Sequence, residues 1–230
     1  MAKIGFIITA GGVGKRMGTE LPKQFINLCG RPILIHTLER IYKACPQGEF
    51  VVVLPNQWIS TWNKLYSEYQ CNVPHSVVVG GDERFHSVKN GIIALKNAEY
   101  IAVHDGVRPL VTLELIESLI YSAETNGCAI PTIKPVDSMR RLSETGENSP
   151  VDRNRFVMVQ TPQIFRSEWL RKAYDCDYTA NFTDDASVVE AAGYRITLVE
   201  GDRKNIKITT AEDLLLAETF INAENNKINE

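Results

Sequence analysis

The stretch Ile4-Gly5-Phe6-Ile7-Ile8-Thr9-Ala10-Gly11-Gly12-Val13-Gly14-Lys15-Arg16-Met17-Gly18 decides the fold. It begins as an apolar run typical of a buried β-strand and continues as a glycine-rich turn. This run covers residues 4–9, and further short runs rich in valine and isoleucine recur at residues 50–54, 76–79, 100–104, 128–133, 156–159 and 195–199. Their apolar character is nearly continuous, as in strands that helices cover on both faces. The sequence therefore predicts an α/β fold, Rossmann-like and doubly wound, with a mostly parallel sheet.

Helical patterns separate these runs. The stretch 112–125 carries one apolar stripe, formed by Ile116, Leu119, Ile120 and Ala123. The last helix is expected to begin at Thr209, because Thr209 and Glu212 have the spacing of a capping box. Residues 136–155 are polar and lack a helical stripe. A segment of this length inside a compact domain predicts a functional loop or hairpin, here a protruding polar β-arm.

Length and composition restrict the class of protein. A chain of 230 residues with 44% hydrophobic residues predicts one domain over residues 1–230. The 25 basic and 28 acidic residues give a net charge of −3, so we expect no nucleic-acid partner. The apolar stretch 4–10 is too short for a signal segment or a membrane span, and we expect no membrane partner. Five cysteines without a Cys-x-x-Cys pair favour a reduced, cytoplasmic setting over disulfides or zinc.

The glycine-rich turn has the composition of a phosphate-binding site. Its backbone N–H groups are free to converge on an anion, and Arg16 and Lys23 follow closely enough to fold over it. A P-loop is disfavoured because Lys15 is followed by Arg16 rather than by serine or threonine. A dinucleotide fingerprint is disfavoured because the second strand ends in Leu54-Pro55-Asn56, without a carboxylate. The alternative is an ordinary glycine turn, and the two cations favour phosphate.

Polar residues also follow other strands, where ligands collect in doubly wound sheets. Gly80-Gly81 precedes a helix on which Arg84 and Ser87 share a face. This turn either binds a base or phosphate, or it is only the start of a helix that carries a solvated arginine. Asp105 ends the fourth strand and is a candidate Mg²⁺ ligand, with a turn into Pro109 as the alternative. Arg153, Thr183 and Lys207 have ordinary explanations as a solvated loop charge, a helix N-cap and an exposed lysine.

Taken together, these pieces resemble the family of 2-C-methyl-D-erythritol 4-phosphate cytidylyltransferases, which serve the methylerythritol phosphate route to isoprenoids. The matching motifs occur in order along nearly the whole chain, and jointly they are highly specific. They are Ala10-Gly11-Gly12-x-Gly14-x-Arg16-Met17 with Pro22-Lys23-Gln24, Gly80-Gly81-x-x-Arg84-x-x-Ser87-Val88, Val103-His104-Asp105-x-x-Arg108-Pro109, Asp152-Arg153, Gln160-Thr161-Pro162-Gln163-x-Phe165, Thr183-Asp184-x-Ala186-Ser187 and Gly201-Asp202-x-x-Asn205-Ile206-Lys207-x-Thr209.

The resemblance implies that CTP and a polyol phosphate, 2-C-methyl-D-erythritol 4-phosphate, react to give 4-diphosphocytidyl-2-C-methyl-D-erythritol and pyrophosphate. It also implies Mg²⁺ as cofactor, with Asp105 as its candidate ligand, and a homodimer in which the arm of one chain reaches the other. The implied catalytic residues are Arg16, Lys23, Arg153 and Lys207. The implied nucleotide-binding residues are Ala10, Gly11, Gly12, Gly14, Gly80, Gly81, Arg84, Ser87 and Asp105. The implied acceptor-binding residues are Asp105, Arg108, Arg153, Thr183 and Lys207.

The chain departs from the family pattern at three places. It has Ala10-Gly11-Gly12 where the family more often has Ala-Ala-Gly, Gly106-Val107 where two small residues are usual, and Asp137-Ser138 where Asp-Thr is usual. Ribitol-5-phosphate cytidylyltransferases look similar over the nucleotide half, so ribitol 5-phosphate is the alternative acceptor. A Rossmann-like oxidoreductase and a non-catalytic nucleotide-binding module are the alternatives from other classes of protein.

Overall fold

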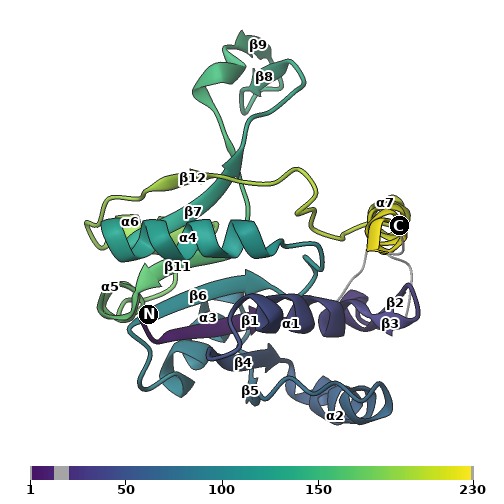
Figure 1. Ribbon diagram of the computed structural model, residues 1–230. Coiled ribbons are helices and arrows are strands. Elements are labelled where there is room, and N and C mark those ends of the chain that lie inside the picture. The colour runs from purple at the N-terminus through teal and green to yellow at the C-terminus, as the bar shows by residue number, and fades with distance from the viewer. Residues whose placement is uncertain (1, 13–20, 229–230) are drawn as a thin grey trace.

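The computed structural model describes residues 2–12 and 21–228, and within them an eight-stranded sheet forms the centre of the molecule (Figure 1). The strand order is β10-β7-β11-β6-β1-β4-β5, and β12 pairs with β7. The strands are β1 (Ile4–Thr9), β4 (Glu49–Leu54), β5 (Ser76–Val79), β6 (Tyr100–Asp105), β7 (Cys128–Ile133), β10 (Met158–Val159), β11 (Gln163–Arg166) and β12 (Leu198–Glu200). The predicted α/β fold is thereby confirmed.

Strand β1 lies at the middle of the sheet and is parallel to both of its neighbours. Ile7 is in register with Val51 of β4 and with Val103 of β6. Strand β11 is antiparallel to β6 and β7 and separates them, so the sheet is mixed at this side. The sequence pattern missed β11, because polar Gln163 and Arg166 stand at its ends and leave only two apolar residues between them. The strand expected over 156–159 was too long, since only β10 pairs with β7.

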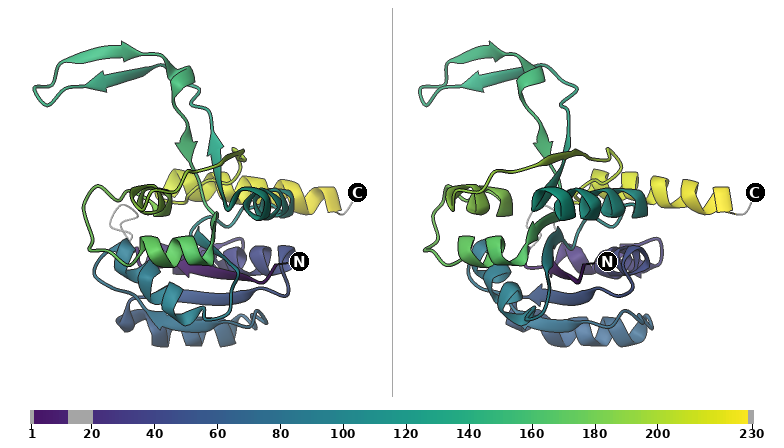
Figure 2. Two further views of the ribbon diagram at one scale, coloured as in Figure 1. Left: turned by 90° about the vertical axis from the view of Figure 1, so that its left-hand side faces the viewer. Right: turned by 60° about the vertical axis from the view of Figure 1, so that its left-hand side comes forward.

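Helices cover both faces of the sheet, as the continuous apolar runs predicted (Figure 2). One core cluster joins Phe6 and Ile8 of β1 to three helices, and a second joins Ile7 of β1 to three others. The first three helices are α1 (Ile33–Ala44), α2 (Ile59–Glu68) and α4 (Leu113–Asn126). The others are α3 (Arg84–Ala94), α5 (Ser167–Ala173) and α6 (Asp185–Ala191). Each fully buried Ile or Phe side chain contributes about 1.5–3 kcal/mol, so β1 is held from both faces.

Helix α4 matches its predicted stripe, whereas the start of helix α7 (Ala211–Ile228) does not match its predicted cap. Within the α4 stripe, Ile116, Leu119 and Ala123 are buried and Ile120 is half-buried. At α7, the backbone N–H of Thr210 donates to Asp213 Oδ2 (2.9 Å), and the N–H of Asp213 donates to Thr210 Oγ1 (3.3 Å). The predicted pair of Thr209 with Glu212 was wrong by one residue, because two overlapping pairs have the same spacing.

Helix α7 anchors the end of the chain beside the carboxyl edge of the sheet. Ile208, Ala217 and Ile221 join a third core cluster with Val107 and with Leu28 of a small hairpin. This hairpin consists of β2 (Asn27–Leu28) and β3 (Arg31–Pro32). No described helix is both long and apolar enough to cross a membrane. The packing of α7 fixes the segment that precedes it, residues 201–210, against the central sheet.

The polar segment 136–155 forms the predicted arm, a hairpin of β8 (Met139–Leu142) and β9 (Asn148–Val151) that projects away from the sheet (Figures 1 and 2). Its two strands are antiparallel, with Met139 opposite Val151. The 3₁₀ turn η4 (Arg153–Arg155) follows directly. Most side chains of the hairpin are exposed, so its own packing contributes little to folding.

Two glycines test how closely the helices pack. Gly127 follows α4 with φ +88°, and a β-carbon there would lie 2.2 Å from Trp169 Cη2. Gly193 follows α6 with φ +90° and has open space around it. We expect Gly193→Ala to cost about 1–2 kcal/mol for the left-handed backbone, and Gly127→Ala to cost about 1–3 kcal/mol more for overpacking. Urea unfolding measures both variants, and equal losses would contradict the described contact with Trp169.

Candidate active site

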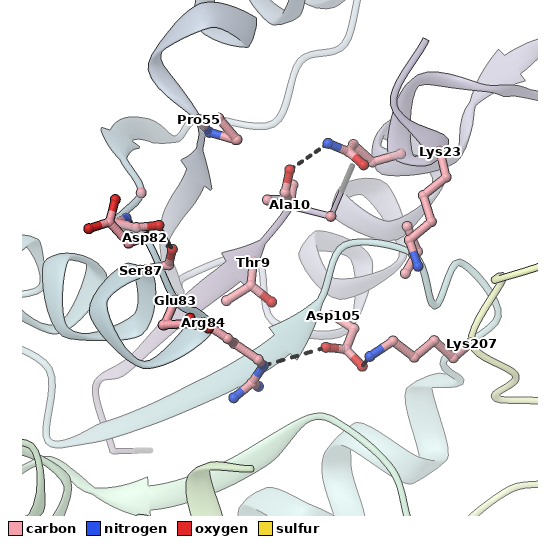
Figure 3. A pocket seen from close by; sticks show the side chains of 16 residues that line it. Thr9, Ala10, Lys23, Pro55, Asp82, Glu83, Arg84, Ser87, Asp105 and Lys207 are labelled. Carbon is pink, nitrogen blue, oxygen red and sulfur yellow. Dashed lines mark hydrogen bonds and ion pairs between the residues drawn. The ribbon is translucent and has the colours of Figure 1, made fainter. Parts of the chain in front are cut away.

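A pocket of about 280 Å³ lies where the parallel strands β1, β4, β5 and β6 end (Figure 3). Parallel strands present their carboxyl ends at one edge, so residues far apart in the sequence meet there. The lining residues are Thr9, Ala10, Gly11, Gly12, Lys23, Gln24, Pro55, Gly80, Gly81, Asp82, Glu83, Arg84, Ser87, Asp105, Val107 and Lys207. Ten of the residues predicted for the site thus come together within the part of the chain that the structure describes.

The centre of the pocket is Asp105, whose side chain is only 8% exposed. Its Oδ2 atom lies 3.1 Å from Lys207 Nζ and 3.2 Å from Arg108 Nε, and its Oδ1 lies 4.0 Å from Arg84 Nε. Burial alone would raise the pKa of Asp105, but Lys207, Arg84 and Arg108 outweigh it and hold that pKa far below its ordinary value. Asp105 therefore stays ionised throughout the physiological pH range.

Two buried side chains fix the backbone of Asp105. Its N–H donates to Thr161 Oγ1 (3.1 Å), and this hydroxyl also lies 3.1 Å from His104 Nδ1. His104 Nε2 faces the carbonyl oxygen of Arg108 at 3.3 Å. A neutral His104 with its proton on Nε2 satisfies all three contacts, since Thr161 then donates to Nδ1. Sequence reasoning gave neither residue a role in the site, because they act through Asp105 rather than by facing the pocket.

The segment before α7 delivers Lys207. The N–H of Ile208 donates to the carbonyl oxygen of Val107 (2.9 Å), next to the end of β6. Asn205 is fully buried, its Nδ2 donates to the carbonyl oxygen of Thr161 (2.8 Å), and its own carbonyl oxygen accepts from Arg108 Nη1 (2.7 Å). Lys207 therefore reaches Asp105 from a backbone that is held on both sides.

Lys23 enters the pocket from the 3₁₀ turn η2 (Lys23–Phe25). The next residue, Gln24, is buried and donates from Nε2 to the carbonyl oxygen of Ala10 (2.5 Å), tying the turn to the end of β1. A β-carbon on Gly12 would lie 3.2 Å from Lys23 Cε, so the glycine leaves room for the lysine. Figure 3 shows Lys23 and Lys207 on the same side of the pocket.

The Gly80-Gly81 turn is shaped by the helix that follows it. Its second N–H, that of Gly81, donates to Ser87 Oγ at 3.1 Å. A β-carbon on Gly81 would lie 2.4 Å from His86 Cβ, a distance at which the backbone would have to move. The turn therefore requires glycine because it packs directly against α3, and Ser87 already holds it in the absence of a ligand.

The remaining predicted residues lie elsewhere. Arg108 is buried and engages Asp105 and Asn205, and it does not line the pocket. Thr183 is exposed beside a smaller cavity of about 90 Å³ that shares Arg84 with the main pocket. The alternative interpretation of Thr183 as a helix N-cap was wrong by one residue, since Asp184 caps α6 and accepts from the N–H of Ser187 (2.9 Å).

Arg153 lies on the arm, where it donates to the carbonyl oxygen of Val136, and it does not line the pocket of its own chain. The predictions for Gly14 and Arg16 fall outside the described residues. Within the described residues, no group of three or more His, Cys, Asp or Glu side chains is arranged to hold a metal ion.

Glycine turns, convergent cations and a buried carboxylate at the carboxyl edge of a parallel sheet are suited to binding a nucleotide's phosphates, and the comparisons place the chain among nucleotidyltransferases. The model of one family, described as 2-C-methyl-D-erythritol 4-phosphate cytidylyltransferase, matches residues 4–223, and the chain belongs to this family. The family prediction from the sequence is confirmed, and the alternatives of an oxidoreductase and a non-catalytic module are set aside.

Individual relatives and structures agree. Proteins named 2-C-methyl-D-erythritol 4-phosphate cytidylyltransferase match from Bacteroides thetaiotaomicron, at 45% identity over 95% of this chain and 100% of the relative, and from Porphyromonas gingivalis, at 46% over 94% and 96%. The crystal structure of 4-diphosphocytidyl-2C-methyl-D-erythritol synthase from Anaerococcus prevotii has a TM-score of 0.82 and 26% identity, over 96% of this chain and 99% of that one.

The burial of His104 predicts a pH-dependent stability. Burial lowers the pKa of His104 from its ordinary value of 6.5 to about 4. As the pH falls from 6.5 to 4, the unfolded chain gains a proton that the folded chain does not, so stability present above pH 6.5 is lost. For a shift of this size the loss is about 3 kcal/mol.

We expect His104→Asn to remove this part of the pH dependence. Urea unfolding of both proteins at pH 7 and pH 4 measures it, and the variant should lose about 3 kcal/mol less than the wild type. Burial also lowers the pKa of His36 and His75, and their contributions remain in both proteins. Equal losses in the two proteins would show that His104 is not held neutral.

Proposed function

We propose that this chain catalyses cytidylyl transfer from CTP to 2-C-methyl-D-erythritol 4-phosphate in the pocket around Asp105. Pyrophosphate and 4-diphosphocytidyl-2-C-methyl-D-erythritol are the products. The observation that carries this assignment is the gathering of Lys23, Arg84 and Lys207 in one pocket with the buried carboxylate of Asp105 and two glycine turns. Membership of the family supports the same reaction. The protein is therefore a cytidylyltransferase.

Cytidylyl transfer to a phosphate monoester requires cations in the active site rather than a general base. A phosphate monoester has a second pKa near 6, so at pH 7 the attacking oxygen is already largely a dianion. The barrier arises when this anion approaches the α-phosphorus of CTP and when negative charge passes to the leaving pyrophosphate. In this proposal Lys23, together with Arg16, stabilises the transferring phosphoryl group. Lys207 and Arg153 hold the attacking phosphate in line.

The ion pair between Lys207 and Asp105 supports this division of roles. Lys207 is 42% exposed although it lies 3.1 Å from Asp105, so an incoming phosphate has access to its ammonium group. Asp105 lowers the net positive charge of the pocket and holds the lysine in place. Two phosphate-bearing substrates then meet cations whose positions are already set, which reduces the cost of ordering side chains on binding.

Mg²⁺ is the proposed cofactor, and Asp105 is its proposed protein ligand. The donor set fits: Mg²⁺ commonly takes one or two carboxylate oxygens and completes its shell with substrate phosphates and water. Asp105 Oδ1 supplies such an oxygen, since Arg84 Nε, its ion-pair partner, stands 4.0 Å away. When bound, the ion would neutralise charge on the phosphates of CTP.

A pyrophosphate-release assay tests the reaction and the acceptor. We expect release from CTP with Mg²⁺ present to require 2-C-methyl-D-erythritol 4-phosphate and to be slow with ribitol 5-phosphate. The same assay with ATP, GTP or UTP controls for the nucleotide. Faster release with ribitol 5-phosphate would overturn the assignment of the acceptor, and release that needs no acceptor would overturn transfer itself.

We also propose that the protein works as a homodimer whose arms are exchanged between active sites. Arg153 does not line the pocket of its own chain, although the family motif gives it a role there. The base of the arm exposes a contiguous apolar run whose members are each 41–45% exposed, namely Phe156, Val157, Met158 and Val159. Such a run on a monomer favours an interface, and a two-fold axis would bring each arm to the other chain.

Mixing two inactive variants tests the exchange. Lys23→Ala disables the pocket and Arg153→Ala disables the arm, and each homodimer should be almost inactive. Refolding equal amounts together gives heterodimers in which one of the two sites joins an intact pocket to an intact arm. We expect about a quarter of the wild-type activity to return in the mixture. No recovery despite verified heterodimers would show that Arg153 acts within its own chain.

The cytoplasm is the proposed location. All five cysteines are described and all are free, Cys29 and Cys176 being exposed. Exposed thiols persist in a reducing compartment and tend to oxidise outside it.

A further inference from the structure

A second carboxylate, Asp185, lies behind the pocket and has no role in the reaction described so far. It is the first residue of α6 and is fully buried. Its Oδ1 and Oδ2 accept from Arg84 Nη1 (2.9 Å) and Nη2 (2.6 Å), a bidentate pair between the start of α6 and the start of α3.

The surroundings of Asp185 are fixed on every side. Gln163 of β11 accepts from the N–H of Ala186 and donates to Asp184 Oδ2, at 2.9 Å each, which ties α6 to the sheet. Tyr174 is buried and donates from its hydroxyl to Asp185 Oδ1 (2.7 Å). Its ring stacks on Phe85 of α3, with centroids 4.7 Å apart. Asp185 therefore has no freedom to follow Arg84 elsewhere.

Arg84 is the partner that has freedom to move. Its side chain is 34% exposed, and it lines both the main pocket and the smaller cavity beside Thr183. With both terminal nitrogens on Asp185, its Nε lies 4.0 Å from Asp105 Oδ1, outside hydrogen-bond distance. A guanidinium stays charged at any physiological pH. If the carboxylate of Asp185 were removed, Arg84 would therefore be stabilised by pairing with another carboxylate nearby. Asp105 is the carboxylate that it already faces.

We propose that Asp185 is a positioning residue for the transfer reaction. It holds the guanidinium of Arg84 away from Asp105 and thereby keeps Asp105 Oδ1 available to the proposed Mg²⁺ ion in the pocket. This inference rests on the proposed function of the pocket. The balance between two carboxylates decides where the cation sits. Arg84 pairs with Asp185 because Asp185 offers two carboxylate oxygens in bidentate geometry, whereas Asp105 is already paired with Lys207 and Arg108.

The substitution Asp185→Asn removes the charge and leaves the shape. We expect Arg84 to close on Asp105 Oδ1 and kcat to fall by about 10- to 100-fold, the scale of a misplaced group in an active site. In an Arg84→Ala background the added Asp185→Asn should change kcat little, because no guanidinium remains to be held. Tyr174→Phe is the matched control, since it removes a hydrogen bond to Asp185 but keeps the pair with Arg84.

A role confined to packing predicts a different pattern. Tyr174→Phe and Asp185→Asn would then both act through stability, and the loss from Asp185→Asn would be the same with and without Arg84. Unchanged kcat in Asp185→Asn, or an equal loss in the Arg84→Ala background, overturns the proposal.

A crystal structure of unliganded Asp185→Asn gives a readout that needs no activity. Arg84 Nε or a terminal nitrogen should lie within hydrogen-bond distance of Asp105 Oδ1, closer than the present 4.0 Å. An Arg84 that stays in place, or that turns to solvent or to another acid, overturns the positioning role even if the wild-type protein failed to use CTP. Failure of the pyrophosphate assay alone would instead overturn the proposed function.

Discussion

Asp105 holds a negative charge at the carboxyl end of β6, where only 8% of its side chain reaches solvent. A buried carboxylate is costly unless cations and hydrogen bonds surround it. Here the compensation comes from Lys207 and Arg108 at hydrogen-bond distance and from Arg84 slightly farther away. Compensation of this one charge therefore brings together three segments: the one before α7, the loop after β6 and the start of α3.

The cations around Asp105 differ in how firmly they are held. Arg108 is buried and donates to Asp105 and to the carbonyl oxygen of Asn205, so it is a fixed part of the protein framework. Lys207 is 42% exposed, and Asp105 holds its compact charge where an incoming phosphate can reach it. Arg84 lies between these cases because it is shared by two carboxylates. The same attraction thus gives one buried cation, one exposed cation and one that is shared with a second carboxylate.

The sequence predicted the sheet well where consecutive apolar-rich residues formed a strand, and poorly where polar residues interrupted the run. Strands β1, β5 and β7 have the predicted bounds, because six or four consecutive apolar-rich residues leave little ambiguity. Strand β11 was missed because its ends are polar, and its pairing comes from β6 and β7 rather than from its own composition. At the start of α7, two overlapping capping pairs made the position of the cap ambiguous by one residue.

The site was predictable where side chains face the pocket and carry charge. Motifs located Lys23, Arg84, Asp105 and Lys207, all of which line it. The supporting residues were not given such roles, because they act through other residues rather than by facing the pocket. Thr161, Asn205 and Asp185 do so across long sequence separations, and His104 does so through its contact with Thr161. The topology of the sheet is what brings Thr161 to Asp105, Asn205 to Thr161 and Asp185 to Arg84.

The attachment of residues 205–208 to the loop after β6 also has a consequence for protein synthesis. The N–H of Ile208 pairs with the carbonyl oxygen of Val107, and Asn205 reaches Thr161, so residues 205–208 complete a structure that much earlier residues begin. Chains are made from the N-terminus and segments fold as they emerge. While the ribosome still holds residues 205–208, Asp105 lacks Lys207 and the carbonyl of Asn205 that orients Arg108. A nascent chain therefore carries most of the sheet before it carries a working pocket, which forms only after residues 205–208 have left the ribosome.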